Sequence, residues 1–156
     1  MKITKTKYKD GKMYIEYKKK NSKGDYDEFT LSCIDAPRSE YEKLIEKLCP
    51  FVIELCELPQ DYLSRITVKS VSFSFGGDSE IMGVVITAAM KLKNSNTPLN
   101  LNTPHKPSEH YSSAGGDDSL LLPEKCVEIL EALQEECAQY IDGVRAQPDL
   151  FKNKEA

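Results

Sequence analysis

The chain has 156 residues, of which 40% are hydrophobic and 29% are charged, and its formal net charge is −4. This length is sufficient for one domain with its own hydrophobic core, so folding requires neither a disulfide framework nor a structural metal. No hydrophobic run reaches the roughly 18 residues of a membrane-spanning helix, and Met1–Lys5 lack the hydrophobic core of a signal peptide, so we expect a cytoplasmic protein without a membrane partner.

The charge is distributed unevenly along the chain. Residues 1–24 contain nine lysines and two acidic residues, a net charge of +7, whereas the remaining 132 residues carry a net charge of −11. Lysines on a strand can contact phosphate groups, but they also prevent edge-to-edge aggregation, and we favour the second explanation. The acidic remainder opposes wrapping by long DNA.

Residues 1–33 predict three consecutive antiparallel strands. Asp10-Gly11 is typical of a type I′ turn between strands over 2–9 and 12–20, because both central residues of such a turn have positive φ. In the second strand, hydrophobic residues occupy every other position, so one face of this strand meets the core. A second turn at 21–24 leads into the third strand.

Two amphipathic helices are predicted from hydrophobic residues at three- and four-residue spacing. The first begins at Ser39, where Glu42 completes a capping box, and Pro50 predicts a kink or a restart because proline removes a backbone donor. The last helix begins at Pro123, and Gly143 suits its C-terminal cap.

A second pair of strands is predicted between the helices, over 66–75 and 81–92. The first alternates hydrophobic residues with serines, and the second is hydrophobic on both faces, although its tail over 87–93 is also compatible with a helix. This order predicts a single α+β domain over 1–156, with an antiparallel sheet of about five strands and two main helices on one face. The other face of the sheet is expected to remain open.

Residues 94–119 form a long polar segment without hydrophobic periodicity, which we interpret as a loop. Such loops in compact domains are usually binding loops, lids or disordered inserts. Prolines stiffen this segment, so that it can present amide, hydroxyl, imidazole and ammonium groups to a ligand or partner. A solvated connection and an arm that bridges subunits of a homo-oligomer remain alternatives. The predicted binding residues are Asn96, Asn100, Asn102, Thr103, His105, Lys106, Ser108 and His110.

The sequence contains no recognisable catalytic or metal-binding constellation. Both histidines lie in the polar segment with no regular element to fix them, which disfavours a metal site. The five cysteines lack CxxC spacing and occupy positions where hydrophobic residues are expected, so we interpret them as reduced core side chains. The glycine pairs at 76–77 and 115–116 match no nucleotide-binding fingerprint. We therefore expect a non-enzymatic protein without cofactor or metal; an enzyme that uses His105 or His110 is the alternative.

The lysine- and tyrosine-rich first hairpin is a second candidate surface. Tyr14 lies on its polar face and could stack on a base, while Lys12, Lys18 and Lys20 contact phosphates. This pattern allows nucleic-acid binding, which we rank below the first interpretation.

Three segments, 71–77, 91–95 and 102–108, resemble uncharacterised small proteins encoded by bacteriophages and prophages. The resemblance includes no catalytic motif and implies only a setting, that of a viral accessory protein inside a bacterial host cell. In this setting, the hypothesis is a binding protein that inhibits anti-phage defence by stoichiometric capture of a host defence protein or a small nucleotide-like signal. The alternative is a nucleic-acid-binding accessory protein of phage DNA metabolism that uses the basic N-terminal hairpin.

Overall fold

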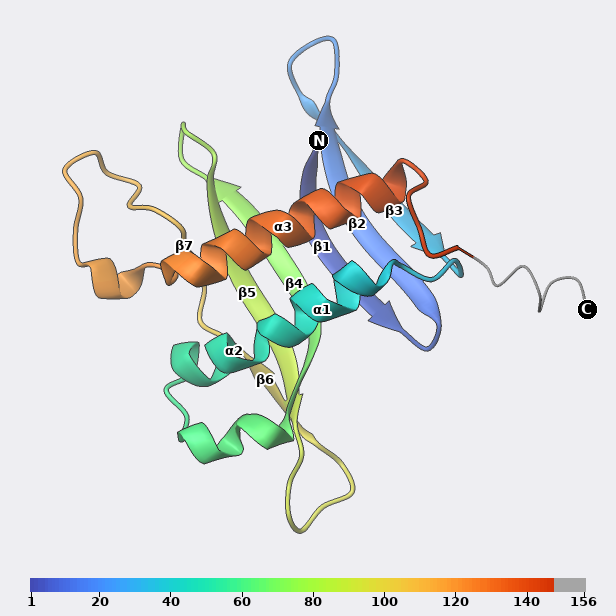
Figure 1. Ribbon diagram of the computed structural model, residues 1–156. Coiled ribbons are helices and arrows are strands. Elements are labelled where there is room, and N and C mark those ends of the chain that lie inside the picture. The colour runs from blue at the N-terminus through green and yellow to red at the C-terminus, as the bar shows by residue number, and fades with distance from the viewer. Residues whose placement is uncertain (148–156) are drawn as a thin grey trace, which may run out of the picture.

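The computed structural model describes residues 1–147 and is built on one antiparallel sheet (Figure 1). The strands follow the order β3-β2-β1-β4-β5-β6, and β7 also pairs with β5. The predicted α+β class is confirmed, with seven strands in place of about five and three α-helices in place of two. The strands are β1 (Lys2–Lys9), β2 (Lys12–Lys20), β3 (Tyr26–Cys33), β4 (Ile66–Gly76), β5 (Ile81–Met90), β6 (Leu99–Asn102) and β7 (Lys106–Pro107). The helices are α1 (Ser39–Lys47), α2 (Cys49–Leu55) and α3 (Glu124–Ile141), with short 3-10 helices η1 (Gln60–Arg65) and η2 (Asp118–Leu120).

The turns between the first three strands form as their sequences predict. Asp10 and Gly11 have φ angles of 54° and 74°, which are the positive values that a type I′ turn requires. In the second turn, the side-chain oxygen of Asn21 accepts hydrogen bonds from the backbone N–H groups of Lys23 and Asp25. This second turn joins β2 to β3, which pair in a continuous register.

The first helical region confirms one prediction and corrects another. Helix α1 ends before Pro50, and α2 starts again with this proline in its first turn. The capping box is wrong, because Ser39 is already helical and Arg38 is the N-cap residue without a side-chain cap. Instead, Nε and Nη2 of Arg38 donate to the carboxylate of Glu136 in α3, at 2.9 and 2.6 Å. This ion pair joins the start of α1 to α3.

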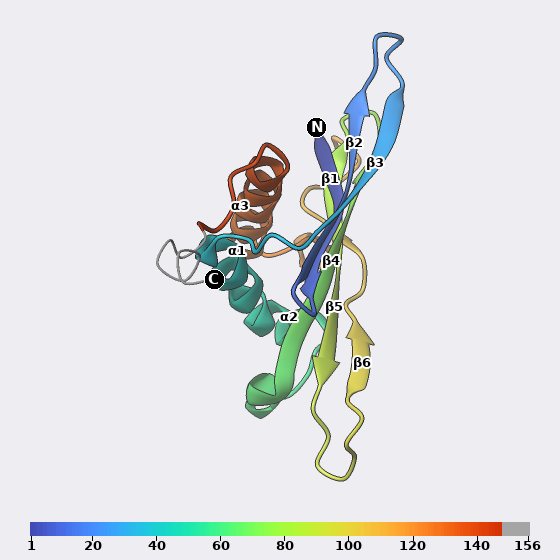
Figure 2. The same ribbon diagram turned by 90° about the vertical axis from the view of Figure 1, so that its right-hand side faces the viewer.

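The core lies between the helices and one face of the sheet (Figure 2). The hydroxyl groups of Thr6 and Tyr41 are buried there and lie 2.9 Å apart, which satisfies both. All five cysteines are free thiols, and burial raises the pKa of Cys126 and Cys137 to about 12. Both thiols therefore stay protonated at neutral pH. The largest fully buried hydrophobic side chains include Met13, Ile15, Leu48, Val52, Val71, Val84, Ile86, Leu130 and Leu133.

The segment that we expected to be a loop contributes two strands to the sheet. Strands β6 and β7 pair one after the other with the outer edge of β5. Between them, Thr103 is buried, and its N–H donates to the carbonyl of Ile86 at 2.9 Å while its hydroxyl accepts the N–H of Ile86 at 2.8 Å. Strand β5 is therefore central, as its hydrophobic sequence indicates, and the polar segment is its partner.

The anchoring role of Thr103 predicts the effect of one substitution. Thr103→Val keeps the shape of the side chain but leaves the buried N–H of Ile86 without its acceptor. We expect the free energy of unfolding to fall by about 1–3 kcal/mol, measured by urea denaturation.

The matched control is Thr67→Val at an exposed position of β4, which should change the free energy of unfolding by less than about 0.5 kcal/mol. Equal stability of Thr103→Val and the unchanged protein would show that the hydroxyl does not anchor this segment.

Candidate functional site

The helices cover one face of the sheet and leave the other uncovered (Figure 2). Because side chains alternate between faces, the buried Val71 and Phe73 place Ser72 and Ser74 on the uncovered side. The same argument, with the strand registers, assigns the remaining residues of this surface, which we call the open face. Its polar and aromatic members include Lys5, Lys7, Lys9, Lys12, Tyr14, Glu16, Lys18, Lys20, Tyr26, Glu28, Thr30, Ser32, Thr67, Ser70, Ser72, Ser74, Thr87, Asn100 and Asn102.

Three of the predicted binding residues lie on the open face, at separate positions along β5. Asn100 and Asn102 extend from β6, and the side-chain oxygen of Asn102 accepts a hydrogen bond from the hydroxyl of Thr87 at 2.8 Å. Nε2 of His105 lies 2.8 Å from Oγ of Ser74 in β4. The first contact joins β6 to β5 and the second joins the edge segment to β4, so the side chains of Asn102 and His105 are held in place by the sheet.

The other predicted binding residues lie elsewhere. Nζ of Lys106 donates to the carbonyl of Ser119, and the backbone N–H of Ser108 donates to the carbonyl of Met82. The His110 imidazole contacts the carboxylate of Asp118 at 2.8 Å. Asn96 is exposed in the turn before β6, and Thr103 is buried in the sheet. The eight residues therefore do not form one site.

Glycine 83 allows the His105 ring to lie against the sheet. A Cβ at this position would overlap Nε2 of His105 and would lie 3.0 Å from Oγ of Ser74. Gly83 is itself buried beneath the ring. A second glycine has a similar role, since a Cβ on Gly76 would lie 3.1 Å from the ring of Tyr111. The rings of His105 and Tyr111 thus pack against glycines of the sheet, where no side chain occupies the space.

The Ser74–His105 pair has the distance of a nucleophile and its base but lacks a partner that would orient the imidazole. Within residues 1–147, no carboxylate is hydrogen-bonded to His105, and the one hydrogen bond of its side chain is to Ser74. In the same part of the chain, no three histidine, cysteine or acidic side chains gather at distances suitable for a metal ion. The pair therefore attaches the edge segment to β4.

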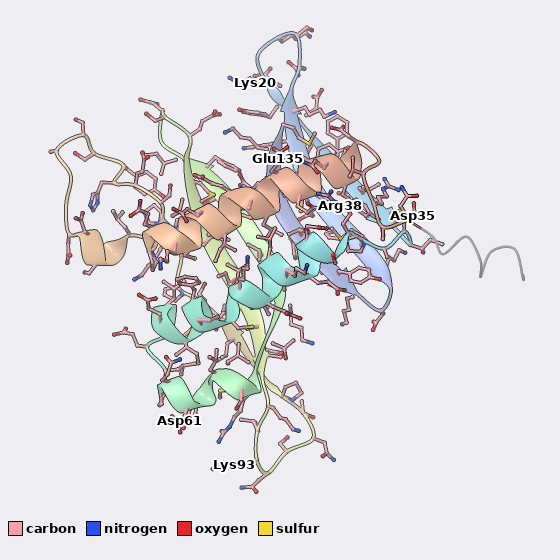
Figure 3. All side chains as sticks on the ribbon, in the orientation of Figure 1. Lys20, Asp35, Arg38, Asp61, Lys93 and Glu135 are labelled. Carbon is pink, nitrogen blue, oxygen red and sulfur yellow. The ribbon has the colours of Figure 1, made fainter. Side chains whose placement is uncertain are left out.

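The three lysines of the basic hairpin are separated. Lys12 begins β2 and Lys20 ends it, so their Cα atoms lie about 26 Å apart at roughly 3.3 Å per residue. The ammonium groups of Lys18 and Lys20 lie 4.6 and 5.6 Å from the ring centre of Tyr26, whose hydroxyl donates to Glu80. Hydrogen bonding to Tyr26, with the charge of neighbouring lysines, lowers the pKa of Glu80. Figure 3 shows Lys20 and Lys93 at opposite ends of the molecule.

Comparisons of the chain with protein-family models, with curated proteins and with solved structures found no match. Among residues 1–147, no helix combines the length and the apolar character needed to cross a membrane. The chemistry of the open face is therefore the basis for a functional proposal.

The contact between Gly83 and His105 can be tested by substitution. Gly83→Ala places a methyl group where the imidazole lies, so we expect the Ser74–His105 hydrogen bond to break and the free energy of unfolding to fall by about 1–3 kcal/mol. The loss is measured by urea denaturation, and displacement of the ring by the NMR shifts of His105.

The double substitution Gly83→Ala with His105→Ala is the control. It should recover most of the lost stability, because removal of the ring leaves space for the methyl group. If the double variant is as unstable as the sum of the two single variants, the glycine is required for another reason.

Proposed function

We propose that the protein is a non-enzymatic binding protein of viral origin that inhibits anti-phage defence in the bacterial cytoplasm by stoichiometric capture. The observation that carries the binding role is the open face, a polar surface that spans the sheet and that no helix covers. The viral setting is supported by the resemblance of segments 71–77, 91–95 and 102–108 to phage-encoded proteins.

The open face is suited to a partner rich in hydrogen-bond acceptors. Lys5 and Ser72 are neighbours across β1 and β4, so an ammonium group and a hydroxyl group lie beside each other in the middle of the sheet. Asn102 adds an amide on the far side of β5. The hydrogen bond from Thr87 holds the Asn102 side chain before a partner arrives, which reduces the entropy lost on binding. Acceptor-rich partners include a nucleotide-like signal and the acidic surface of a defence protein.

Plating of phage on bacteria that each carry one defence system tests this function. The protein should restore plaque formation against at least one system, and the double variant Lys5→Glu/Lys7→Glu should lose this effect because both charges on the open face are reversed. Inhibition should follow the molar ratio of the protein to its target, as expected for capture without turnover.

The matched control is Lys43→Glu/Lys47→Glu, which makes the same charge change at exposed positions of α1. Full inhibition by the open-face variant, or inhibition by amounts far below the target concentration, would contradict the proposal.

A second candidate function is nucleic-acid binding by the basic hairpin. It is favoured by the lysine–tyrosine contacts on the open face, where Nζ of Lys7 lies 5.1 Å from the ring centre of Tyr14 and Lys18 and Lys20 lie over Tyr26. Stacked rings and phosphate contacts are the usual elements of single-strand binding.

Fluorescence anisotropy with a labelled oligonucleotide at increasing salt distinguishes the two functions. We expect weak binding, because Lys18 lies opposite Glu28 and Glu80 lies against Lys2 at 3.4 Å, which compensates the positive charge. Tight binding that weakens steeply with salt, and that Lys12→Glu/Lys18→Glu/Lys20→Glu abolishes, would favour the nucleic-acid function instead.

A further inference from the structure

The open face contains a hollow of about 630 Å³ at the end of the sheet opposite the β2–β3 turn. Lys7 and Lys9 of β1 line one side of the hollow, and Lys69 of β4 lies beside them. The hydroxyl groups of Ser70 and Thr87 line its floor. Asn100 lines the side formed by β6. A volume in this range is typical of sites for small molecules.

The hollow exists because two neighbouring strands separate. Strands β1 and β4 are in register only at Lys5–Ser72 and Thr6–Val71, and β4 has an irregularity between Val68 and Ser70. From Lys7 to Lys9, the edge of β1 that faces β4 is not paired with β4. Backbone N–H and C=O groups at such edges are free to bind a ligand.

The separation leaves positive charge on one side of the sheet and negative charge on the other. A second hollow, of about 330 Å³, lies on the helix side and shares Tyr8, Thr67, Val68 and Lys69 with the first. Glu42 and Glu46 of α1 line only this second hollow. Lys69 lines both hollows, whereas Lys7 and Lys9 line only the first, away from these two carboxylates.

The charge of the first hollow favours an anion. Three lysines and one acidic residue, Asp10, line it, which gives a net charge of +2. Within residues 1–147, none of the ion pairs includes Lys7, Lys9 or Lys69. Lysine ammonium groups of this kind bind phosphate oxygens by charge-assisted hydrogen bonds.

We propose that this hollow binds a free nucleotide, whose phosphate contacts Lys7, Lys9 and Lys69. The remaining lining matches a base, because Val68, Ala89 and Pro98 provide an apolar surface and Asn100 provides an amide that can pair with a base edge. Inorganic phosphate alone would leave most of the volume empty. The inference rests on the proposed binding function, and it names the class of ligand that the open face takes.

Isothermal titration calorimetry of the full chain tests the site. The probes are ADP, GDP, UDP, inorganic phosphate and a single-stranded DNA oligonucleotide. We expect one nucleotide to bind per chain, more tightly than phosphate and with less dependence on salt than the oligonucleotide. Lys7→Ala/Lys69→Ala should weaken nucleotide binding at least about tenfold, since each lysine contributes a charge-assisted hydrogen bond.

The matched control is Lys18→Ala/Lys20→Ala, which removes two lysines of the open face that lie outside the hollow and should leave nucleotide affinity unchanged. Lys7 is half-buried and Lys69 is exposed, so unchanged thermal unfolding confirms that the variant is folded. The inference is overturned if no nucleotide binds, if phosphate binds as tightly as nucleotides, if the oligonucleotide binds more tightly than any nucleotide, or if the control loses as much affinity as the hollow variant.

Plaque formation separates this inference from the proposed function. If nucleotides bind but the protein inhibits no defence system, the proposed inhibition of defence is wrong and the nucleotide site is supported. If Lys7→Ala/Lys69→Ala no longer binds nucleotides but still inhibits defence fully, the protein inhibits defence through another part of the open face.

Discussion

The arrangement of the open face depends on one requirement, that the backbone groups at the outer edge of β5 have hydrogen-bond partners. This strand is buried at Ala88 on the helix side and at Gly83 and Ala89 on the other side, so its backbone groups cannot rely on water. Residues 99–108 provide the missing partners, including the N–H of Ser108 for the carbonyl of Met82. The same pairing brings the side chains of β6 onto the open face.

The ion pair between Arg38 and Glu136 joins two of the helices that cover one face of the sheet. The Glu136 side chain is 8% exposed, and a carboxylate at this depth is tolerated only with a well-placed partner. The guanidinium of Arg38 also donates to Gln139, so three side chains fix α1 beside α3. Both helices lie on one side of the sheet, and no helix covers the opposite side (Figure 2).

The sequence predicts those features that are determined by a few neighbouring residues. The Asp10-Gly11 turn, the restart at Pro50 and the alternation of β4 are of this kind. The two added strands are not, because an edge strand with a solvated face needs few hydrophobic residues, and its pairing depends on backbone groups far away in the chain. The capping box failed for the same reason, since the start of α1 is held by a residue 98 positions away. Polar composition singled out Asn100, which lines the proposed hollow, but not Lys69, whose position next to the irregularity in β4 depends on strand pairing.

The lysines that are concentrated in the first 24 residues of the sequence do not form a single basic patch in the folded protein. Lysines of the first 24 residues lie at both ends of the sheet, and at one end Glu80 contacts Lys2 and accepts a hydrogen bond from Tyr26. At the other end, Lys7 and Lys9 of β1 line the hollow together with Lys69 of β4, and Asp10 is the one acidic residue of its lining. The field of such a cluster decays over a Debye length of about 8 Å at physiological salt, so it attracts a compact anion within the hollow more than a long strand that also passes acidic surface. The uncompensated charge therefore favours a ligand that is small enough to be enclosed there.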